Sequence, residues 1–160
     1  MTRLVRDGLD LVCAGLVYCD GGVERPGKLP PERLEPRAFL RRNPGLVGSN
    51  FVIRRERYHA IGGFDESLPS LNDVDFGLRL ALLPDLAYAP IRERRVRHWT
   101  DARPRLTGRT EAKAQGIRRF YALHAHRMSR ADREAFRWRA SQRWRCDEHG
   151  IGVSSDPPGT

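Results

Sequence analysis

The segment Ile61–Arg79 constrains the fold more than any other part of the chain. Its sequence, IGGFDESLPSLNDVDFGLR, holds a glycine pair, two acidic clusters and the start of an apolar helix. Asn72 is a favoured N-cap residue, and apolar side chains after it recur at the i, i+4, i+8 spacing of one helix face. The segment therefore predicts a helix that begins at Asn72 and ends at Pro84, with carboxylates in its first turn.

Strand signals flank this helix on both sides. Leu9–Tyr18 is a nearly continuous apolar run, which is typical of a strand buried on both faces of a sheet. Gly45–Ile53 predicts a second strand whose small residues let another backbone or a ligand come close. Arg25–Pro36 is rich in proline and predicts a loop. Two short strand-like pieces follow the helix, at Leu86–Pro90 and Arg94–Trp99, so the pattern as a whole indicates an α/β fold.

Further helices are expected before and after this core. Arg54–Ile61 predicts one or two helical turns that end at the glycine pair. A longer helix is expected over Thr107–Met128, with one stripe formed by Ile117, Phe120, Tyr121, His124 and Met128. Ser129 predicts the cap of a last helix, with Asp132 three residues on as in a capping box. The aromatic side chains of that helix, expected to dock on the sheet, are Phe136, Trp138 and Trp144.

The net charge of +9 is concentrated in one part of the chain. Residues 1–102 carry 16 basic and 14 acidic side chains, whereas residues 103–145 carry 13 and 3. We therefore expect an α/β part over 1–102, an Arg-rich helical extension over 103–145 and a disordered tail over 146–160. The basic helices suit nucleic acid, an anionic membrane surface or a phosphorylated ligand, or they are an ordinary solvated surface.

Length and composition exclude several classes of protein. A chain of 160 residues suits one domain, and no apolar run approaches the roughly 20 residues of a membrane span. Charged residues interrupt the N-terminus, which excludes a signal peptide and makes the cytoplasm the expected location. Cys13 and Cys19 are expected to be reduced thiols on the same side of one strand, and no Cys/His spacing indicates a zinc site.

Taken in order, several motifs resemble those of family 2 glycosyltransferases of the GT-A fold. They are Gly62–Glu66 (GGFDE), Asn72–Arg79 (NDVDFGLR) and a strand that ends at His98. Upstream, Leu16–Gly27 (LVYCDGGVERPG) and Gly48–Glu66 (GSNFVIRRERYHAIGGFDE) are similar to the family's strand-plus-turn and central segment. The resemblance covers about residues 9–100. It implies a partial GT-A (Rossmann-like) mixed sheet with flanking helices and a C-terminal helical pair.

One departure from the family pattern concerns the nucleotide. The family binds its nucleotide in an N-terminal half that ends in an Asp-x-Asp metal motif, and no Asp-x-Asp precedes Leu16. Only Asp73-Val74-Asp75 has that spacing, and it belongs to the later motif. The resemblance therefore implies the acceptor-side half of a transferase without its nucleotide-binding half. A fragment, a late start of the reading frame and one half of a split enzyme all fit, and the sugar, acceptor, linkage and oligomeric state stay open.

The activity implied by the resemblance is inverting transfer of a hexosyl or deoxyhexosyl group from a nucleotide sugar. The acceptor would be a glycan or a lipid-linked molecule, as in bacterial cell-wall or polysaccharide synthesis. Such transfer needs a base beside the acceptor hydroxyl, and usually Mn²⁺ or Mg²⁺ to compensate the charge of the departing nucleoside diphosphate. The resemblance makes Asp73 that base, and a helix N-terminus favours its anionic form. The Arg-rich helices would contact the inner face of an anionic membrane.

Six further residues are candidates for the site. Asp65 and Glu66 either organise their loop or contact substrate, and His98 stands where some relatives place a metal-binding histidine. The other expected substrate contacts are Asn50, Asn72 and Trp99. Each has a structural alternative, such as loop hydrogen bonding, helix capping or core packing.

Two other functions fit part of the sequence. The chain could be a catalytically inactive remnant or partner subunit of a glycosyltransferase, which keeps the fold without the activity. It could also be an Arg-rich nucleic-acid-binding protein, which predicts tight, salt-sensitive binding. The nucleic-acid hypothesis leaves the acidic cluster Asp65–Asp75 unexplained, because an acidic cleft repels phosphates, so we rank it last.

Overall fold

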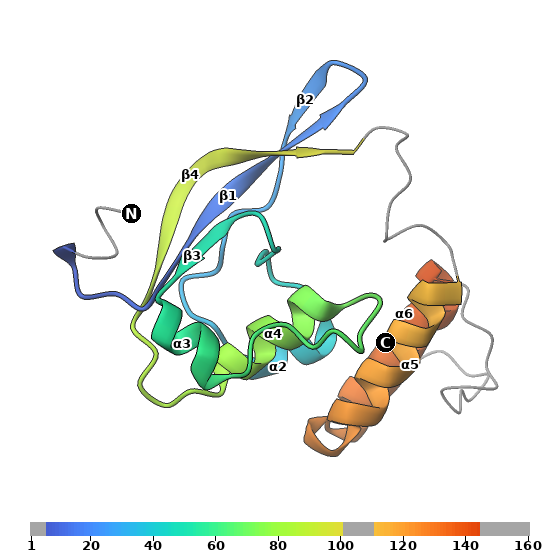
Figure 1. Cartoon of the computed structure of the whole chain (residues 1–160). Helices are drawn as coiled ribbons and strands as arrows, with labels where there is room; N and C mark the ends of the chain where they lie inside the picture. Colours follow the sequence, from blue (N-terminus) through green and yellow to red (C-terminus); the bar gives the residue numbers. More distant parts are fainter. Residues whose placement is uncertain (1–5, 101–110, 145–160) are drawn as a thin grey trace.

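A computed structural model of the chain describes residues 6–100 and 111–144, with side chains up to residue 142. Within this part, helices pack against a small mixed sheet, as the α/β pattern predicted (Figure 1). The elements in chain order are β1 (Leu11–Asp20), β2 (Val23–Pro26), α2 (Pro36–Arg41), β3 (Phe51–Ile53), α3 (Arg55–Ala60), α4 (Asn72–Ala81), β4 (Tyr88–Trp99), α5 (Glu111–His124), the 3-10 turn η1 (Ala125–Arg127) and α6 (Arg130–Trp144).

Strand β1 is the centre of the sheet. It pairs antiparallel with β3 near its start and with β2 near its end, and it runs parallel to β4 along its other edge. All side chains from Leu11 to Leu16 are buried, so the apolar run correctly predicted a strand covered on both faces. Cys13 and Cys19 are both buried free thiols, as expected. The second predicted strand is shorter than expected, because only Phe51–Ile53 of Gly45–Ile53 pairs.

The two strand-like pieces after α4 are one continuous strand, β4, so the prediction of two separate pieces was wrong. The register between β1 and β4 shifts around Gly15, where β4 carries extra residues. A side chain at Gly15 would crowd the β4 backbone, since its Cβ would lie 3.0 Å from the carbonyl oxygen of Glu93. A glycine opposite a bulge is a common way to admit such close approach.

The proline-rich segment is less irregular than predicted. Its first residues belong to β2, whose four side chains are all exposed, and Pro36 opens the short helix α2. Proline is well suited to the first turn of a helix, where its missing N–H is not needed. Helix α2 then buries Phe39 and Leu40 against α4. The residues between β2 and α2 form the predicted loop.

Helix α4 begins at Asn72 as predicted, but it ends at Ala81, before the predicted end at Pro84, and its cap differs. The helix includes Asn72, and the capping position is Leu71, in the left-handed conformation with φ 61°. Leu71 is the one residue other than glycine with positive φ among those described. That conformation costs about 1–2 kcal/mol for an L-residue, so the turn into α4 is strained. The short helix α3 ends as predicted at the glycine pair, where Gly62 and Gly63 both have positive φ.

The Arg-rich helices share the core of the α/β part. The buried stripe of α5, with Ile117 and Phe120, joins Phe76 of α4 and Phe136 of α6 in one apolar cluster. Figure 1 shows the pair α5 and α6 packed together beyond the N-terminal end of α4. Side chains from both sides of the expected boundary at 102/103 therefore fill one core.

The start of α6 confirms the predicted cap. The Asp132 backbone N–H donates to the Ser129 hydroxyl at 3.2 Å, and that hydroxyl donates to the Asp132 carboxylate at 2.6 Å. Phe136 is buried, at 3% exposed, but its ring partners are Phe120 and Tyr121 of α5, so the expected docking on the sheet is not what these contacts show. Trp138 is 49% exposed, against the same prediction. The Trp144 side chain, Cys146 and the predicted tail lie outside the described residues. Among the described helices, none is long and apolar enough to cross a membrane.

Candidate functional site

Asp73 lies in the first turn of α4, partly buried beneath the segment that connects α2 to β3. One carboxylate oxygen accepts a hydrogen bond from the Asn43 side-chain amide at 2.8 Å. The other accepts from the backbone N–H of Val74 at 2.9 Å. Asn43 is held in turn, since its own side-chain oxygen accepts the N–H groups of Gly45 and Leu46. The carboxylate is therefore fixed in orientation by neutral donors.

Burial raises the pKa of Asp73 above its ordinary value. The hydrogen bonds from Val74 and Asn43 and the positive charge of Lys28 act in the opposite direction, but they do not outweigh it. The sequence led us to expect that the helix N-terminus would dominate and favour the anion, and this expectation had the wrong direction. A carboxylate with a raised pKa holds a proton more strongly, which improves it as a proton acceptor.

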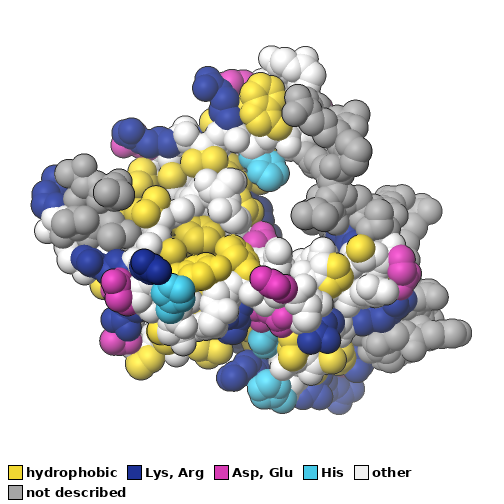
Figure 2. Space-filling model, viewed as in Figure 1, with side chains coloured by type: hydrophobic (Ala, Val, Ile, Leu, Met, Phe, Trp, Pro, Cys, Tyr) yellow, Lys and Arg dark blue, Asp and Glu magenta, His cyan; other side chains and the backbone are white. Residues whose placement is uncertain are grey.

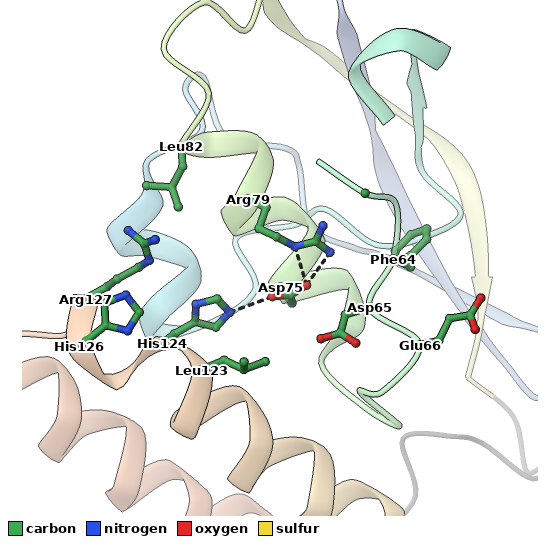
Figure 3. A pocket seen from close by; sticks show the side chains of 11 residues that line it. Phe64, Asp65, Glu66, Asp75, Arg79, Leu82, Leu123, His124, His126 and Arg127 are labelled. Atoms are coloured by element: carbon green, nitrogen blue, oxygen red, sulfur yellow. Dashed lines mark hydrogen bonds and ion pairs between the residues drawn. The ribbon is translucent and has the colours of Figure 1, made fainter. Parts of the chain in front are cut away.

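Asp75, two residues further on, has a different environment. It is 2% exposed, and one of its oxygens accepts from Arg79 Nε at 2.8 Å and Nη2 at 2.6 Å. The other oxygen accepts from Nε2 of His124 on α5 at 2.8 Å (Figure 3). Burial by itself raises the pKa of Asp75, but the hydrogen bonds and charges of His124 and Arg79 outweigh it and lower that pKa. Asp75 is therefore a structural anion that ties α4 to α5.

A groove of about 520 Å³ opens beside this ion-paired cluster. It is bordered by the glycine-pair loop, by α4 and by the turn after α5, and its lining includes Phe64, Asp65, Asp75, His124 and Arg127 (Figure 3). On the face seen in Figure 2, acidic side chains gather between an apolar patch and the helix pair. The groove combines an aromatic side chain, carboxylates and cations, which is a lining suited to a polyhydroxylated ligand.

Asp65 and Glu66 both border this groove but point in different directions. The Asp65 carboxylate accepts hydrogen bonds from the backbone N–H and the hydroxyl of Ser67, and the hydroxyl bond is the main cause of its lowered pKa. Figure 3 shows Asp65 directed towards the Asp75 cluster and Glu66 directed away from it. Asp65 thus organises its loop, and Glu66 is exposed.

Asn50 is placed for a structural role. It is 3% exposed, and its amide nitrogen donates to the carbonyl oxygens of Ala14 and Gly45, each at 2.8 Å. Its side-chain oxygen accepts the Val47 N–H at 2.8 Å. These bonds use its polar atoms within the fold, so Asn50 is placed as a structural residue and not as a substrate contact.

Asn72 is exposed at the first residue of α4, and its side-chain oxygen accepts the backbone N–H of Asp73 at 2.8 Å. It therefore supports the local geometry of Asp73 even though the cap itself is Leu71. A substrate contact by Asn72 stays a prediction.

His98 and Trp99 lie at the end of β4, away from the residues that line the groove. His98 contacts Tyr18 edge-to-face, with ring centroids 5.9 Å apart, and Trp99 is 61% exposed. Within residues 6–100 and 111–142, no three His, Cys, Asp or Glu side chains gather into a group that could hold a metal ion. The described residues thus do not form a metal site around His98.

Two residues of the site were not expected from the sequence. Asn43 follows a pair of arginines and precedes Pro44, a pattern that signals only a turn. His124 carried a usable signal, because a polar side chain on the buried stripe of a helix needs a hydrogen-bond partner. Its Nδ1 is buried without a partner among the described residues.

Comparisons with protein-family models, with curated protein sequences and with solved structures find no match to this chain. The family resemblance therefore rests on the motifs quoted above.

Proposed function

We propose that this chain is the acceptor-side half of an inverting family 2 glycosyltransferase with a GT-A-type sheet, and that Asp73 is its catalytic base. The observation that carries the proposal is the contrast between two carboxylates on one helix. Asp75 is neutralised by Arg79 and His124, whereas Asp73 is oriented by amide groups and has a raised pKa. A catalytic base needs an environment like that of Asp73, in which no cation of the described residues is paired with the carboxylate. The type of reaction, inverting sugar transfer, is inferred from the order of the sequence motifs.

In the proposed reaction, a hydroxyl of the acceptor donates a hydrogen bond to the Asp73 carboxylate. As the hydroxyl oxygen forms its bond to the anomeric carbon, the bond from that carbon to the nucleoside diphosphate breaks, and the proton passes to Asp73. The leaving group keeps the electron pair of the broken bond. Attack from the face opposite the leaving group inverts the anomeric configuration.

The surrounding residues position this base rather than react. The Asn43 amide and the Val74 N–H each bind one carboxylate oxygen, and every carboxylate oxygen has a second lone pair for the acceptor hydroxyl. The bond from the Asn72 side chain to the Asp73 N–H fixes the backbone at the same point. The groove beside Asp65 supplies a neighbouring surface on which the glycan part of an acceptor can rest.

The test is sugar transfer from a panel of nucleotide sugars, measured as release of nucleoside diphosphate. It is run on the 160-residue chain and on a form extended by any upstream in-frame sequence. Asp73→Asn should lower the transfer rate by about 10²–10⁴-fold, the usual contribution of a general base. Asp20→Asn, the same chemical change at the exposed last residue of β1, is the control and should leave the rate unchanged.

If transfer survives in Asp73→Asn, then Asp73 is not the catalytic base. Absence of transfer in both forms would overturn the enzyme proposal and favour the inactive remnant or partner subunit.

A further inference from the structure

A second groove, of about 710 Å³, lies on the α2 side of the molecule and is strongly basic. Its charged lining residues are Lys28, Arg37, Arg41 and Arg42, and no carboxylate lines it. Asn43, the residue that orients Asp73, also lines it. We call this the basic groove. The four positive side chains of the basic groove would repel each other unless negative charge lies among them.

One buried carboxylate organises two of these cations. Asp132, at the start of α6 and 2% exposed, accepts from Arg37 Nε at 3.0 Å and from Arg41 Nε at 2.7 Å. Burial by itself raises the pKa of Asp132, but the bonds from Ser129 and both arginines outweigh it and lower that pKa. Only the Nε atoms are used, and within the described residues the terminal Nη nitrogens of Arg37 and Arg41 make no hydrogen bond. Each guanidinium is therefore held in place with its outer donors still available.

Lys28 stands on another part of the lining and is fixed as well. Its ammonium donates to the backbone carbonyl of Asn43 at 2.6 Å, while the side chain of the same Asn43 binds Asp73 at 2.8 Å. One residue thus joins the basic groove to the proposed base. A ligand held by Lys28 through an anionic group can present a hydroxyl, or the bond being broken, to Asp73.

We propose that the basic groove binds a phosphate or diphosphate group of a substrate. Guanidinium groups with exposed nitrogens match phosphate oxygens in geometry, and charge-assisted bonds of this kind are the strong ones. The anion site stands on its own geometry, while the assignment to a substrate rests on the proposed function. The diphosphate could belong to the acceptor or to the nucleotide, because both present the same chemistry.

The test is calorimetric titration of the full chain with inorganic pyrophosphate. Wild type should bind saturably, and Lys28→Gln combined with Arg42→Gln should weaken binding at least tenfold, as expected for loss of charge-assisted bonds. The matched control removes two exposed arginines elsewhere, Arg25→Gln with Arg55→Gln, and should bind as wild type does. Thermal unfolding of each variant verifies that the fold is intact. Arg37 and Arg41 are left in place, because their loss would leave the buried Asp132 without a counter-charge.

Lack of saturable pyrophosphate binding, or equal weakening in both double variants, would overturn the proposal, since either result means only general attraction to a basic protein. Duplex DNA that displaces pyrophosphate from the groove with a steep salt dependence would also count against a built phosphate site. Tighter binding of a short prenyl diphosphate than of pyrophosphate would place the group on the acceptor, and tighter binding of a nucleoside diphosphate would place it on the donor. Asp73→Asn should lower the transfer rate by about 10²–10⁴-fold while it retains pyrophosphate binding, so failure of the anion site and failure of the base assignment are distinguishable.

Discussion

Replacement of Gly116 by alanine tests how closely α5 packs against the loop that leads into α4. A Cβ at this buried position would lie 2.7 Å from both the backbone nitrogen and the carbonyl oxygen of Ser70. Ser70 is itself fixed, because it is 6% exposed and its hydroxyl donates to the Lys113 carbonyl at 3.1 Å. The Ser70 hydroxyl is also in the way, but since two of the obstacles are backbone atoms, rotation of that side chain cannot remove the clash and the substitution must move either α5 or the loop.

Two opposing effects determine how much Gly116→Ala changes the free energy of unfolding. Helix propensity alone would make the substitution stabilising by about 1 kcal/mol. Overpacking of a buried site costs about 1–3 kcal/mol, occasionally more, and a clash with two backbone atoms belongs at or above the upper end. We therefore expect a net loss of about 2 kcal/mol in the free energy of unfolding, which lowers the Tm of a chain of this size by roughly 4–8 °C.

Urea unfolding followed by far-UV circular dichroism measures this loss. The matched control is Gly48→Ala, because a Cβ at Gly48 meets nothing within 4 Å. We expect the control to change the free energy of unfolding by no more than about 0.5 kcal/mol. If Gly116→Ala proved as stable as wild type or more stable, the close packing of α5 on Ser70 would be refuted.

Three further predictions concern buried polar groups. Asp75→Asn should lower the free energy of unfolding by about 3 kcal/mol, because it leaves Arg79 and His124 without their buried counter-charge; a loss below about 1 kcal/mol would contradict this. The lowered pKa of Asp75 means that its stabilisation is complete above the unfolded Asp pKa of about 3.9 and is lost as the pH falls through the folded pKa. Urea midpoints of wild type and Asp75→Asn should therefore converge as the pH falls from about 5 to 2, whereas a constant gap would show that Asp75 carries no charge-dependent stability. Burial raises the pKa of Cys13 to about 12, so Cys13 should resist iodoacetamide in the folded chain and react after unfolding; labelling of folded Cys13, located by mass spectrometry, would contradict its burial.

Local patterns in the sequence predicted those parts of the fold that depend on neighbouring residues. The apolar run of β1, the helical spacing of α4 and the cap at Ser129 are all set within one element, and each was found. The start of α4 differed because Leu71 adopts a left-handed conformation that no sequence rule assigns to leucine. Strand β4 was read as two pieces because its bulge interrupts the apolar alternation without ending the strand.

The contacts that define the site depend on residues far apart in the chain. The bond from Asn43 to Asp73 spans 30 residues, and the bond from His124 to Asp75 spans 49. Sequence spacing placed Asp73 and Asp75 in one helical turn, but it could not predict that the two carboxylates have different hydrogen-bond partners. The difference comes from which segments pack against each aspartate, and burial reversed the expected direction of the Asp73 pKa.

The proposal depends most on the division of roles between Asp73 and Asp75. The most direct measurement is a pH titration of the side-chain carboxyl carbons of the labelled chain by NMR, with Asp73→Asn and Asp75→Asn used to assign the two signals. Asp73 should titrate above the ordinary Asp pKa of about 3.9, and Asp75 should titrate below it. The reverse order, or two equal values, would contradict the assignment of Asp73 as the base.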